Sequence, residues 1–196
     1  MTETRRYESP ARAAKAEATR RAILQAFRDQ LVEPGRDALS PTDAAKTARC
    51  SVRTVHGYFP TKESRVVALA ELLETELWSE PVRPPQTADD LPEHFRRIHR
   101  KALGDPLAAA LIRHGGVEWE EVRAQRRAER LGAVRRVIAD IGAPAEPTEH
   151  ATAAALALAG AEISLAMRDQ LGVDADRAPD AIAYAIEAIV ADLRRY

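Results

Sequence analysis

The chain has 196 residues, enough for one large domain or two small ones, and its 45% apolar and 30% charged residues are typical of a globular protein. The single cysteine, Cys50, excludes an intrachain disulfide. No apolar stretch approaches the roughly 20 residues that a membrane-spanning helix needs, and the N-terminus lacks the apolar run of a signal peptide. We therefore expect a cytoplasmic protein.

The net charge of −1 hides an uneven distribution. Residues 1–65 contain 13 Lys and Arg against 8 Asp and Glu, whereas residues 66–196 contain 16 against 22. A basic first third joined to an acidic remainder suggests a nucleic-acid-binding end attached to a second module, although such a balance is also common in domains that bind no DNA. Abundant alanine, 5% aromatic residues and few alternating β-branched runs favour an all-α fold.

The first expected helix covers residues 11–32. Ile23, Phe27 and Leu31 recur every four residues and so share one face, while arginines occupy the opposite face. This pattern predicts a scaffold helix whose apolar stripe packs on the segment that follows.

Residues 40–63, SPTDAAKTARCSVRTVHGYFPTKE, predict two short helices separated by a tight turn. Ser40 is an N-cap candidate, and Pro41 suits a first helical turn because its missing N–H is not needed there. Ser51 is a second N-cap candidate that opens a helix over residues 52–58. Helix, three-residue turn and helix is the arrangement of a DNA-reading helix-turn-helix.

The outer face of the second short helix is the candidate DNA-reading surface, because Val55 and Phe59 share the inward face. Arg53 is suited to guanine O6 and N7 or to a phosphate, Val52 to a thymine methyl group, and His56 to a base or a phosphate. An ordinary surface side chain is the alternative for each candidate. The complete set of predicted DNA-binding residues is Thr42, Ser51, Val52, Arg53, Thr54, His56, Tyr58 and Lys62.

Six further helices are expected, which gives about nine in total. Their ranges are 61–80, 91–103, 106–114, 117–141, 148–171 and 179–195, with N-cap candidates at Thr61, Asp90, Asp105 and Thr148. Prolines between residues 81 and 89 predict a linker. We divide the chain into a DNA-binding domain, residues 1–60, and a second domain, residues 61–196.

No catalytic pattern stands out. The sequence has no HExxH, no paired CxxC and no Walker-type glycine loop, and the five histidines form no arrangement typical of a metal site or of a nucleophile with its base. Cys50 takes the place of a small apolar residue within the helix-turn-helix, so we expect it to be packed rather than reactive. We expect no enzyme activity, no cofactor and no metal.

The segment around residues 40–63 resembles the DNA-binding core of the TetR family of one-component transcriptional regulators. The resemblance extends over residues 21–73, and YFPTKE at 58–63 is its most specific part. The chain departs from the family pattern at Arg49, where the turn usually has glycine, at His56, where tyrosine is usual, and at Gly57, where a larger residue is common. The matching residues are Asp43, Ala45, Ala48, Ser51, Thr54, Val55, Tyr58, Phe59, Pro60, Lys62 and Glu63.

The resemblance implies an N-terminal three-helix DNA-binding domain followed by a helical ligand-binding and dimerisation domain. It implies a ligand-responsive transcriptional regulator, with a repressor as the preferred interpretation, that binds an inverted-repeat operator as a homodimer. An activator or architectural DNA-binding protein of the same fold is the alternative, and an all-α enzyme or protein-binding module is a further one. The implied partners are double-stranded operator DNA, a second copy of the chain and an unknown small-molecule effector.

Ligand-binding candidates in the second domain follow from the resemblance and from the preference of pockets for aromatic side chains with a few polar groups. They are Trp78, Phe95, His99, His114, Trp119, Arg123 and Glu162, with core packing or solvent exposure as the alternative for each. We expect most arginines of residues 117–141 to lie at the surface, in ion pairs with nearby glutamates, so they give no indication of an anionic ligand.

Dimer-interface candidates come from the last two long helices, through which members of the TetR family pair. Small and apolar residues there would let helices approach closely, and burial in the core of one chain is the alternative. The candidates are Ala155, Leu158, Ala159, Ile163, Ile182, Ile186 and Ile189.

Overall fold

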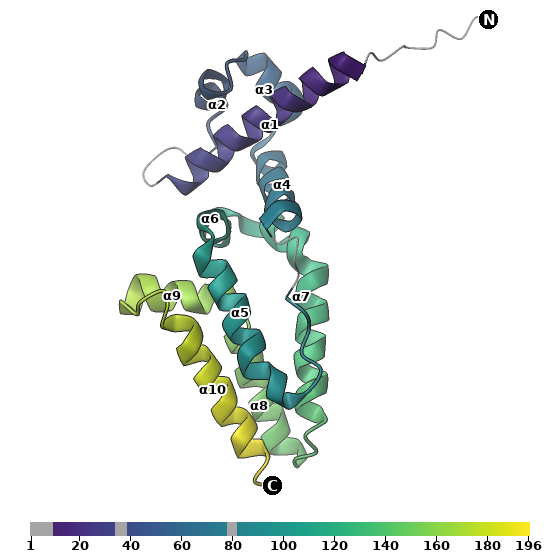
Figure 1. Cartoon of the computed structure of the whole chain (residues 1–196), viewed down its shortest axis with the longest axis vertical. Coiled ribbons are helices and arrows are strands. Elements are labelled where there is room, and N and C mark those ends of the chain that lie inside the picture. Colours follow the sequence, from purple (N-terminus) through teal and green to yellow (C-terminus); the bar gives the residue numbers. More distant parts are fainter. Residues whose placement is uncertain (1–9, 34–38, 78–81) are drawn as a thin grey trace, which may run out of the picture. The chain divides into compact units, whose positions relative to one another are not determined.

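The computed structural model describes residues 10–33, 39–77 and 82–196 (Figure 1). Within these ranges the chain forms ten α-helices and no strand, which confirms the predicted all-α fold. A π-helical turn, η1 (Leu73–Leu77), follows α4, and a 3-10 turn, η2 (Ala88–Asp90), precedes α5. The α-helices are α1 (Pro10–Val32), α2 (Pro41–Thr47), α3 (Val52–Tyr58), α4 (Lys62–Leu72), α5 (Leu91–Gly104), α6 (Pro106–His114), α7 (Gly116–Ala139), α8 (Ala145–Leu158), α9 (Ala161–Leu171) and α10 (Ala178–Leu193).

The chain folds as two compact units, residues 1–72 and residues 73–196. In the first unit, α1 packs on α2 and α4, and α2 packs on α3. Phe27 of α1 and Phe59, which follows α3, meet edge to face with ring centroids 5.9 Å apart. Ile23 and Val55 are fully buried beside them. The apolar stripe predicted for residues 11–32 therefore does hold the two short helices.

Local capping explains why the two short helices begin where they do. The Asp43 N–H donates to Ser40 Oγ at 3.4 Å, and the Thr54 N–H donates to Ser51 Oγ at 3.0 Å. Such bonds satisfy backbone donors that have no partner in the first turn of a helix. The Ser64 N–H donates likewise to Thr61 Oγ1 at 3.1 Å. The bounds predicted for the second short helix, residues 52–58, are confirmed.

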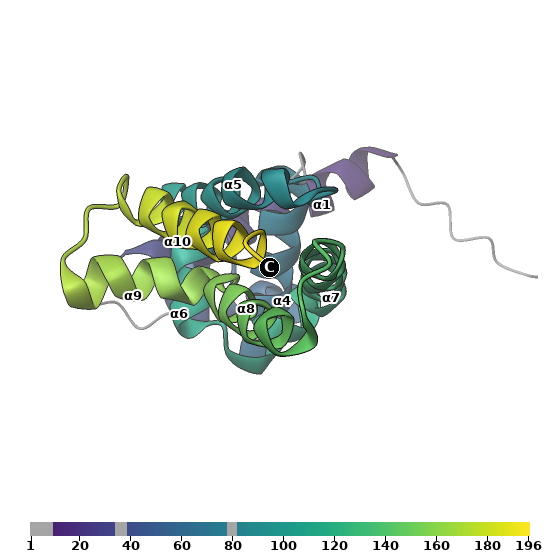
Figure 2. The same ribbon diagram turned by 90° about the horizontal axis from the view of Figure 1, so that it is seen from below.

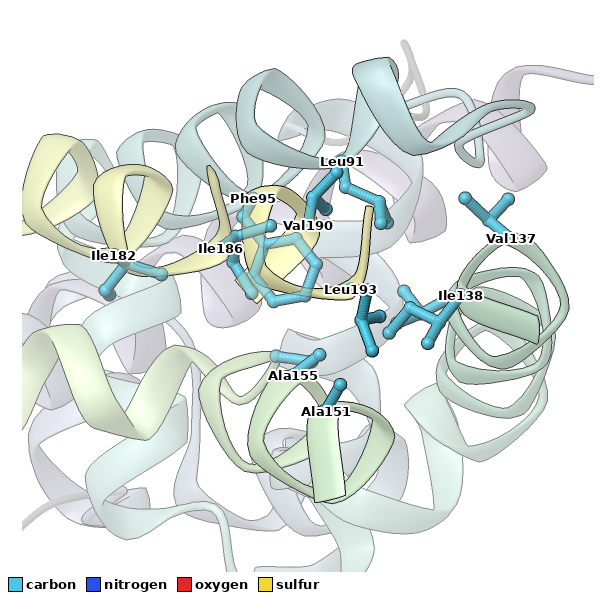
Figure 3. Packing of buried hydrophobic residues seen from close by; sticks show 12 residues of the cluster. Leu91, Phe95, Val137, Ile138, Ala151, Ala155, Ile182, Ile186, Val190 and Leu193 are labelled. Carbon is cyan, nitrogen blue, oxygen red and sulfur yellow. The ribbon is translucent and has the colours of Figure 1, made fainter. Parts of the chain in front are cut away.

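The second unit has one apolar core where α5, α7, α8 and α10 meet. Figure 3 shows Phe95 of α5, Ile138 of α7, Ala155 of α8 and Ile186 of α10 directed into the same interior, and each is at most 1% exposed. Seen from below, α10 lies beside α5 and α8 (Figure 2). The small side chains of α8 allow this close packing.

The single helix predicted over residues 148–171 is in fact two helices, α8 and α9, with a bend of 65° between them. The break falls at Gly160, whose backbone is extended (φ −80°, ψ 129°). This break is the reason for ten helices rather than nine. Among the described residues, no single helix is long and apolar enough to cross a membrane, although α8 and α9 taken together reach that length and composition.

Two predicted N-caps are wrong. The Thr148 hydroxyl lies inside α8 and donates to the carbonyl groups of Ala143 and Pro144. The Asp90 carboxylate accepts from the N–H groups of Gln86 and Thr87, and therefore braces the segment before α5 instead of capping the helix. In both cases the side-chain oxygen bonds a backbone group that precedes its own residue in the chain.

One further helix differs in its bounds from the prediction, and one further predicted N-cap is confirmed. The helix expected over residues 61–80 ends as an α-helix at Leu72 and continues as η1 to Leu77, and its last three positions lie outside the described residues. Asp105 does cap α6, because its carboxylate accepts from the N–H groups of Leu107 and Ala108.

Candidate functional site

The candidate DNA-reading surface is the outer face of α3. Val55 is fully buried, whereas Val52 is 39% exposed and Arg53, His56 and Gly57 are exposed. Helical periodicity therefore divides α3 into an inner and an outer face as the sequence indicated. Of the eight predicted DNA-binding residues, six are exposed and two, Thr54 and Tyr58, are half-buried; the exposed ones are Thr42, Ser51, Val52, Arg53, His56 and Lys62.

Thr54 and Tyr58 both have partners within the first unit. The hydroxyl groups of Ser51 and Thr54 lie 2.8 Å apart, so Thr54 extends the cap of α3. The Tyr58 hydroxyl donates to the Ala16 carbonyl of α1 at 3.1 Å. This bond ties the end of α3 to α1 and leaves an oxygen lone pair of Tyr58 free to accept another hydrogen bond.

The turn between α2 and α3 ends α2 in a Schellman arrangement. The Cys50 N–H donates to the Ala45 carbonyl at 3.0 Å, and the Arg49 N–H donates to the Lys46 carbonyl at 3.3 Å. The residue at the left-handed position is Arg49, with φ 51°. Glycine is favoured at this position because it has no Cβ to clash there, so Arg49 places an exposed positive charge on a strained turn.

Arg65 of α4 joins the parts of this unit, a role that was not predicted from the sequence. Its Nη1 donates to the Leu39 carbonyl at 3.2 Å, and its Nε and Nη2 donate to the Phe59 carbonyl, both at 3.3 Å. Its Cζ lies 5.5 Å from the centre of the Phe27 ring. Arg65 is 6% exposed, and this burial lowers its pKa. A sequence signal existed, since Arg65 precedes Leu69 by four residues on the buried face of α4.

The geometry of α3 suits docking against a double helix. A capped, seven-residue helix with a buried inner face is held rigidly by α1 and by Arg65. Its outer face carries one guanidinium, one imidazole and no carboxylate among residues 52–58. Arginine can bond both acceptors of a guanine edge, and a protonated amine such as Lys62 nearby can bind phosphate.

The second unit brings together only part of the predicted ligand set. Arg123 is 5% exposed, its Nη1 lies 3.3 Å from Glu162 Oε1, and its Cζ lies 5.1 Å from the centre of the Trp119 ring. Trp119 is itself buried, and its Nε1 has no hydrogen-bond partner among the described residues. Arg123 is thus an interior arginine, contrary to the expectation for most of this arginine-rich helix.

Of the other ligand candidates, Phe95 and His99 are neighbours on α5, with ring centroids 6.4 Å apart. Phe95 belongs to the apolar core, and His114 is exposed at the end of α6. His99 is fully buried, and its Nε2 lies 2.9 Å from the Leu158 carbonyl. Trp78 lies outside the described residues.

A pocket of about 390 Å³ lies between α5 and α7, within the size range of small-molecule sites. None of the predicted ligand residues that the structure describes lines it. The signal that was missed is helical spacing, because His94, Ile98 and Lys101 share one face of α5, and Arg126, Glu129 and Arg130 share one face of α7. The lining residues are Val82, Pro84, His94, Ile98, Lys101, Arg126, Glu129 and Arg130.

Burial lowers the pKa of two polar groups that line this pocket, His94 and Arg130. The pKa of His94 is lowered to about 4, chiefly because burial disfavours the charged imidazole. The pKa of Arg130 is lowered to about 10 by burial and by the neighbouring Arg123 and Arg127. Near neutral pH, His94 is therefore uncharged and Arg130 keeps its positive charge. Among the described residues, no group of His, Cys, Asp and Glu side chains is arranged to hold a metal ion.

The predicted dimer residues divide into two sets. Ala155, Ala159, Ile182 and Ile186 are buried in the core of the single chain. The remaining three, Leu158, Ile163 and Ile189, are half-buried and keep some surface.

Neither protein-family models nor curated proteins gave a match to this sequence. Solved structures do match. A TetR transcriptional regulator from Agrobacterium tumefaciens has a TM-score of 0.57 at 18% identity, over 91% of this chain and 99% of its own. RolR, solved with the ligand resorcinol, has a TM-score of 0.51 at 19% identity, over 94% and 95%. NalD, the secondary repressor of the MexAB-OprM multidrug efflux pump in Pseudomonas aeruginosa, has a TM-score of 0.50 at 17% identity, over 89% and 96%.

At these identities the likeness establishes the fold. The chain has the fold of TetR transcriptional regulators, as its resemblance around residues 40–63 implied. The neighbours named by role are a regulator and a repressor.

Proposed function

We propose that this protein is a ligand-responsive transcriptional regulator that binds an inverted-repeat operator as a homodimer and acts as a repressor. The observation that carries the proposal is the outer face of α3, where exposed Arg53 lies on a capped helix held by Arg65. The fold shared with TetR regulators supports it, and NalD is a repressor of that fold. Residues 1–60 would bind DNA, in the cytoplasm, and residues 61–196 would bind the ligand and the second copy.

In this proposal α3 enters the major groove, where Arg53 reads a guanine and Val52 contacts a thymine methyl group. Thr42, Ser51, Thr54, Tyr58 and Lys62 contact phosphates, which position the helix without reading the sequence, and His56 contacts a base or a phosphate. Each copy reads a half-site of a few base pairs, so the two-fold dimer requires an inverted repeat.

We assign the dimer interface to the outer faces of α8 and α10. A groove of about 660 Å³ between these helices is lined by small and apolar side chains, among them Ala154, Ala188 and Ile189, together with charged ones, Glu146, Asp192 and Arg195. Small residues allow a helix of the second copy to approach closely. Ile189→Glu would place a charge in that interface, so light scattering should show a monomer, whereas Glu187→Gln on the same helix should remain a dimer.

The ligand acts by favouring one conformer of the dimer. RolR, which shares the fold, was solved with a small phenolic ligand, which supports a small-molecule site in the second unit. The ligand releases DNA only if it binds more tightly to the conformer that does not fit the operator. An activator of the same fold would share every one of these contacts, and deletion of the gene in a promoter-reporter strain separates the two roles.

The DNA-binding assignment is tested by measuring the affinity for the DNA upstream of its own coding sequence. Arg53→Ala should lose about 1–3 kcal/mol of binding free energy and relax discrimination at one base pair of each half-site. Lys62→Ala should weaken binding to all sequences more evenly. Arg135→Ala, which removes an exposed arginine of α7, is the matched control and should bind normally. If Arg53→Ala and Lys62→Ala both leave operator binding intact, this docking model is wrong.

A further inference from the structure

The pocket between α5 and α7 contains an acceptor without a partner. His94 is 5% exposed, and its Nδ1 lies 3.0 Å from the Arg83 carbonyl. Because a carbonyl oxygen only accepts, Nδ1 carries the proton, and Nε2 of the uncharged ring presents a lone pair. No donor among the described residues satisfies this Nε2, although it is fully buried. A buried acceptor left in this state costs free energy that a hydrogen-bond donor would recover.

The same pocket contains a donor without a partner. Arg130 Nε is buried and has no hydrogen-bond acceptor among the described residues, and the side chain forms no ion pair there. Its neighbour Arg126, one turn earlier on α7, is instead paired with Glu74. Glu162 lies close enough to favour the charged form of Arg130, yet it is ion-paired with Arg123, so the guanidinium of Arg130 has no ion-pair partner of its own among the described residues. Burying such a charge without a counter-ion is unfavourable.

The other residues that line the pocket indicate the chemistry of the main part of a ligand. Val82, Pro84 and Ile98 line the pocket with apolar surface, and the volume of about 390 Å³ accommodates a small molecule. Lys101 also lines it and adds basic character, while Glu129 supplies the carboxylate among the lining residues.

We propose that this pocket binds a small, largely apolar carboxylic acid that also carries a hydroxyl group. The carboxylate accepts hydrogen bonds from the guanidinium of Arg130, and the hydroxyl donates to Nε2 of His94. This inference rests on the proposed function, because it names the chemical class of the effector.

Other ligand classes fit the pocket less well. A cation would meet Arg130, Arg126 and Lys101. A hydrocarbon would leave both His94 Nε2 and Arg130 Nε without a partner, and specificity for polar ligands arises because such groups are costly when unpaired. One uncompensated guanidinium matches a single negative charge, which favours a carboxylate over a phosphate ester with two.

The inference is tested by calorimetric titration of the full chain with defined probes. The hydroxylated acids are the three monohydroxybenzoates and the corresponding hydroxycyclohexanecarboxylates. The matched probes are benzoate and cyclohexanecarboxylate, which lack the hydroxyl, and the hydroxybenzamides, which lack the charge. The best hydroxylated acid should bind about tenfold more tightly than either matched probe, because benzoate leaves His94 Nε2 without a donor and the amide offers Arg130 no anion.

Two substitutions should assign the two contacts. Arg130→Gln should lower the affinity for the acid to that of the amide, and His94→Phe should remove the preference for the hydroxylated acid over benzoate. His94→Gln keeps a side-chain acceptor and should retain part of that preference. Arg135→Gln removes an exposed charge from the same helix and should leave every affinity unchanged. Circular dichroism melts establish that each variant is folded, and Arg130→Met is the alternative if Arg130→Gln is not.

Three results would overturn the inference: no hydroxylated acid binds, the amides bind as tightly as the acids, or Arg130→Gln leaves the difference between acid and amide intact. DNA binding is measured on the same preparations. Salt-sensitive operator binding that is released only by an uncharged compound would refute the ligand class and leave the proposed function standing. Tight binding of an acid by a chain that binds no DNA would support the ligand class and refute the proposed function.

Discussion

The two compact units differ in how completely their buried polar groups are hydrogen-bonded. In the first, the buried guanidinium of Arg65 bonds the backbone carbonyls of Leu39, Phe59 and Pro60. In the second, Nε of the half-buried Arg130 has no hydrogen-bond acceptor among the described residues. Of the six buried side-chain atoms without a hydrogen-bond partner among the described residues, five belong to residues 73–196. Most buried polar side-chain atoms of the first unit are thus hydrogen-bonded, and its candidate binding surface is the exposed face of α3. The second unit keeps several buried polar atoms without a hydrogen-bond partner.

The largest effect should come from breaking the scaffold. Arg65→Met keeps the apolar stem but leaves three backbone carbonyls with fewer donors, so the first unit should lose about 3 kcal/mol of unfolding free energy. Urea denaturation followed by circular dichroism measures this loss, and operator binding should fail in parallel. Arg53→Ala is the control, since it removes an exposed arginine from the same unit and should leave the midpoint unchanged. An unchanged midpoint for Arg65→Met would contradict the role of Arg65.

The second unit should be selectively sensitive to acid. His94 has its pKa lowered from 6.5 to about 4 in the folded chain, so the unfolded chain binds the proton more readily and stability falls as the pH drops from about 6.5 towards 4. Between pH 7 and pH 5 the loss should reach about 2 kcal/mol from this group. Both tryptophans belong to residues 73–196, so tryptophan fluorescence during urea denaturation reports on this unit. A variant His94→Phe with the same loss would show that other groups are responsible.

A smaller effect should follow from removing the cap of α3. Ser51→Ala deletes the oxygen that accepts from the Thr54 N–H, so the first unit should lose about 1 kcal/mol. Ser51→Asp replaces the acceptor and should restore most of the stability, which thermal melts can measure. Equal melting temperatures for wild type and Ser51→Ala would show that tertiary contacts alone fix α3.

The smallest effect should be a gain in the stability of the first unit. Arg49 holds a left-handed conformation with φ 51°, which glycine adopts without a steric cost. Arg49→Gly should therefore stabilise the first unit by about 0.5–1 kcal/mol, as measured by the urea midpoint. Arg49→Ala keeps the Cβ clash while removing the charge, and should give no gain. A gain for Arg49→Ala equal to that for Arg49→Gly would attribute the effect to charge instead of backbone strain.

The difference between contacts with near neighbours and contacts between distant residues explains what the sequence could predict. The caps at Ser40 and Ser51 and the stripe of Ile23 and Phe27 depend on neighbours within a few residues, and all were found from spacing. Arg65 was missed because its partner Leu39 lies 26 residues away. The break at Gly160 was missed because apolar and alanine-rich sequence continues on both sides of it.

The pocket between α5 and α7 was not predicted, for a related reason. His94 and Arg130 come from helices far apart in the sequence, and each has the periodicity of an ordinary helix face. Selecting aromatic residues as lining candidates led instead to Phe95, which packs in the core, and to Trp119, which stacks beside Arg123. Tertiary packing, rather than residue type, decides which polar groups share a cavity.

The central claim, that the face of α3 binds operator DNA, is tested most directly by fluorescence anisotropy of a labelled duplex from upstream of the coding sequence, titrated over a series of KCl concentrations. If α3 binds operator DNA, the logarithm of the affinity should fall linearly and steeply with the logarithm of the salt concentration, because lysine and arginine contacts displace counterions from several phosphates. An excess of unrelated DNA should also fail to displace this duplex. Binding that is absent, or that does not change with salt, would contradict the claim.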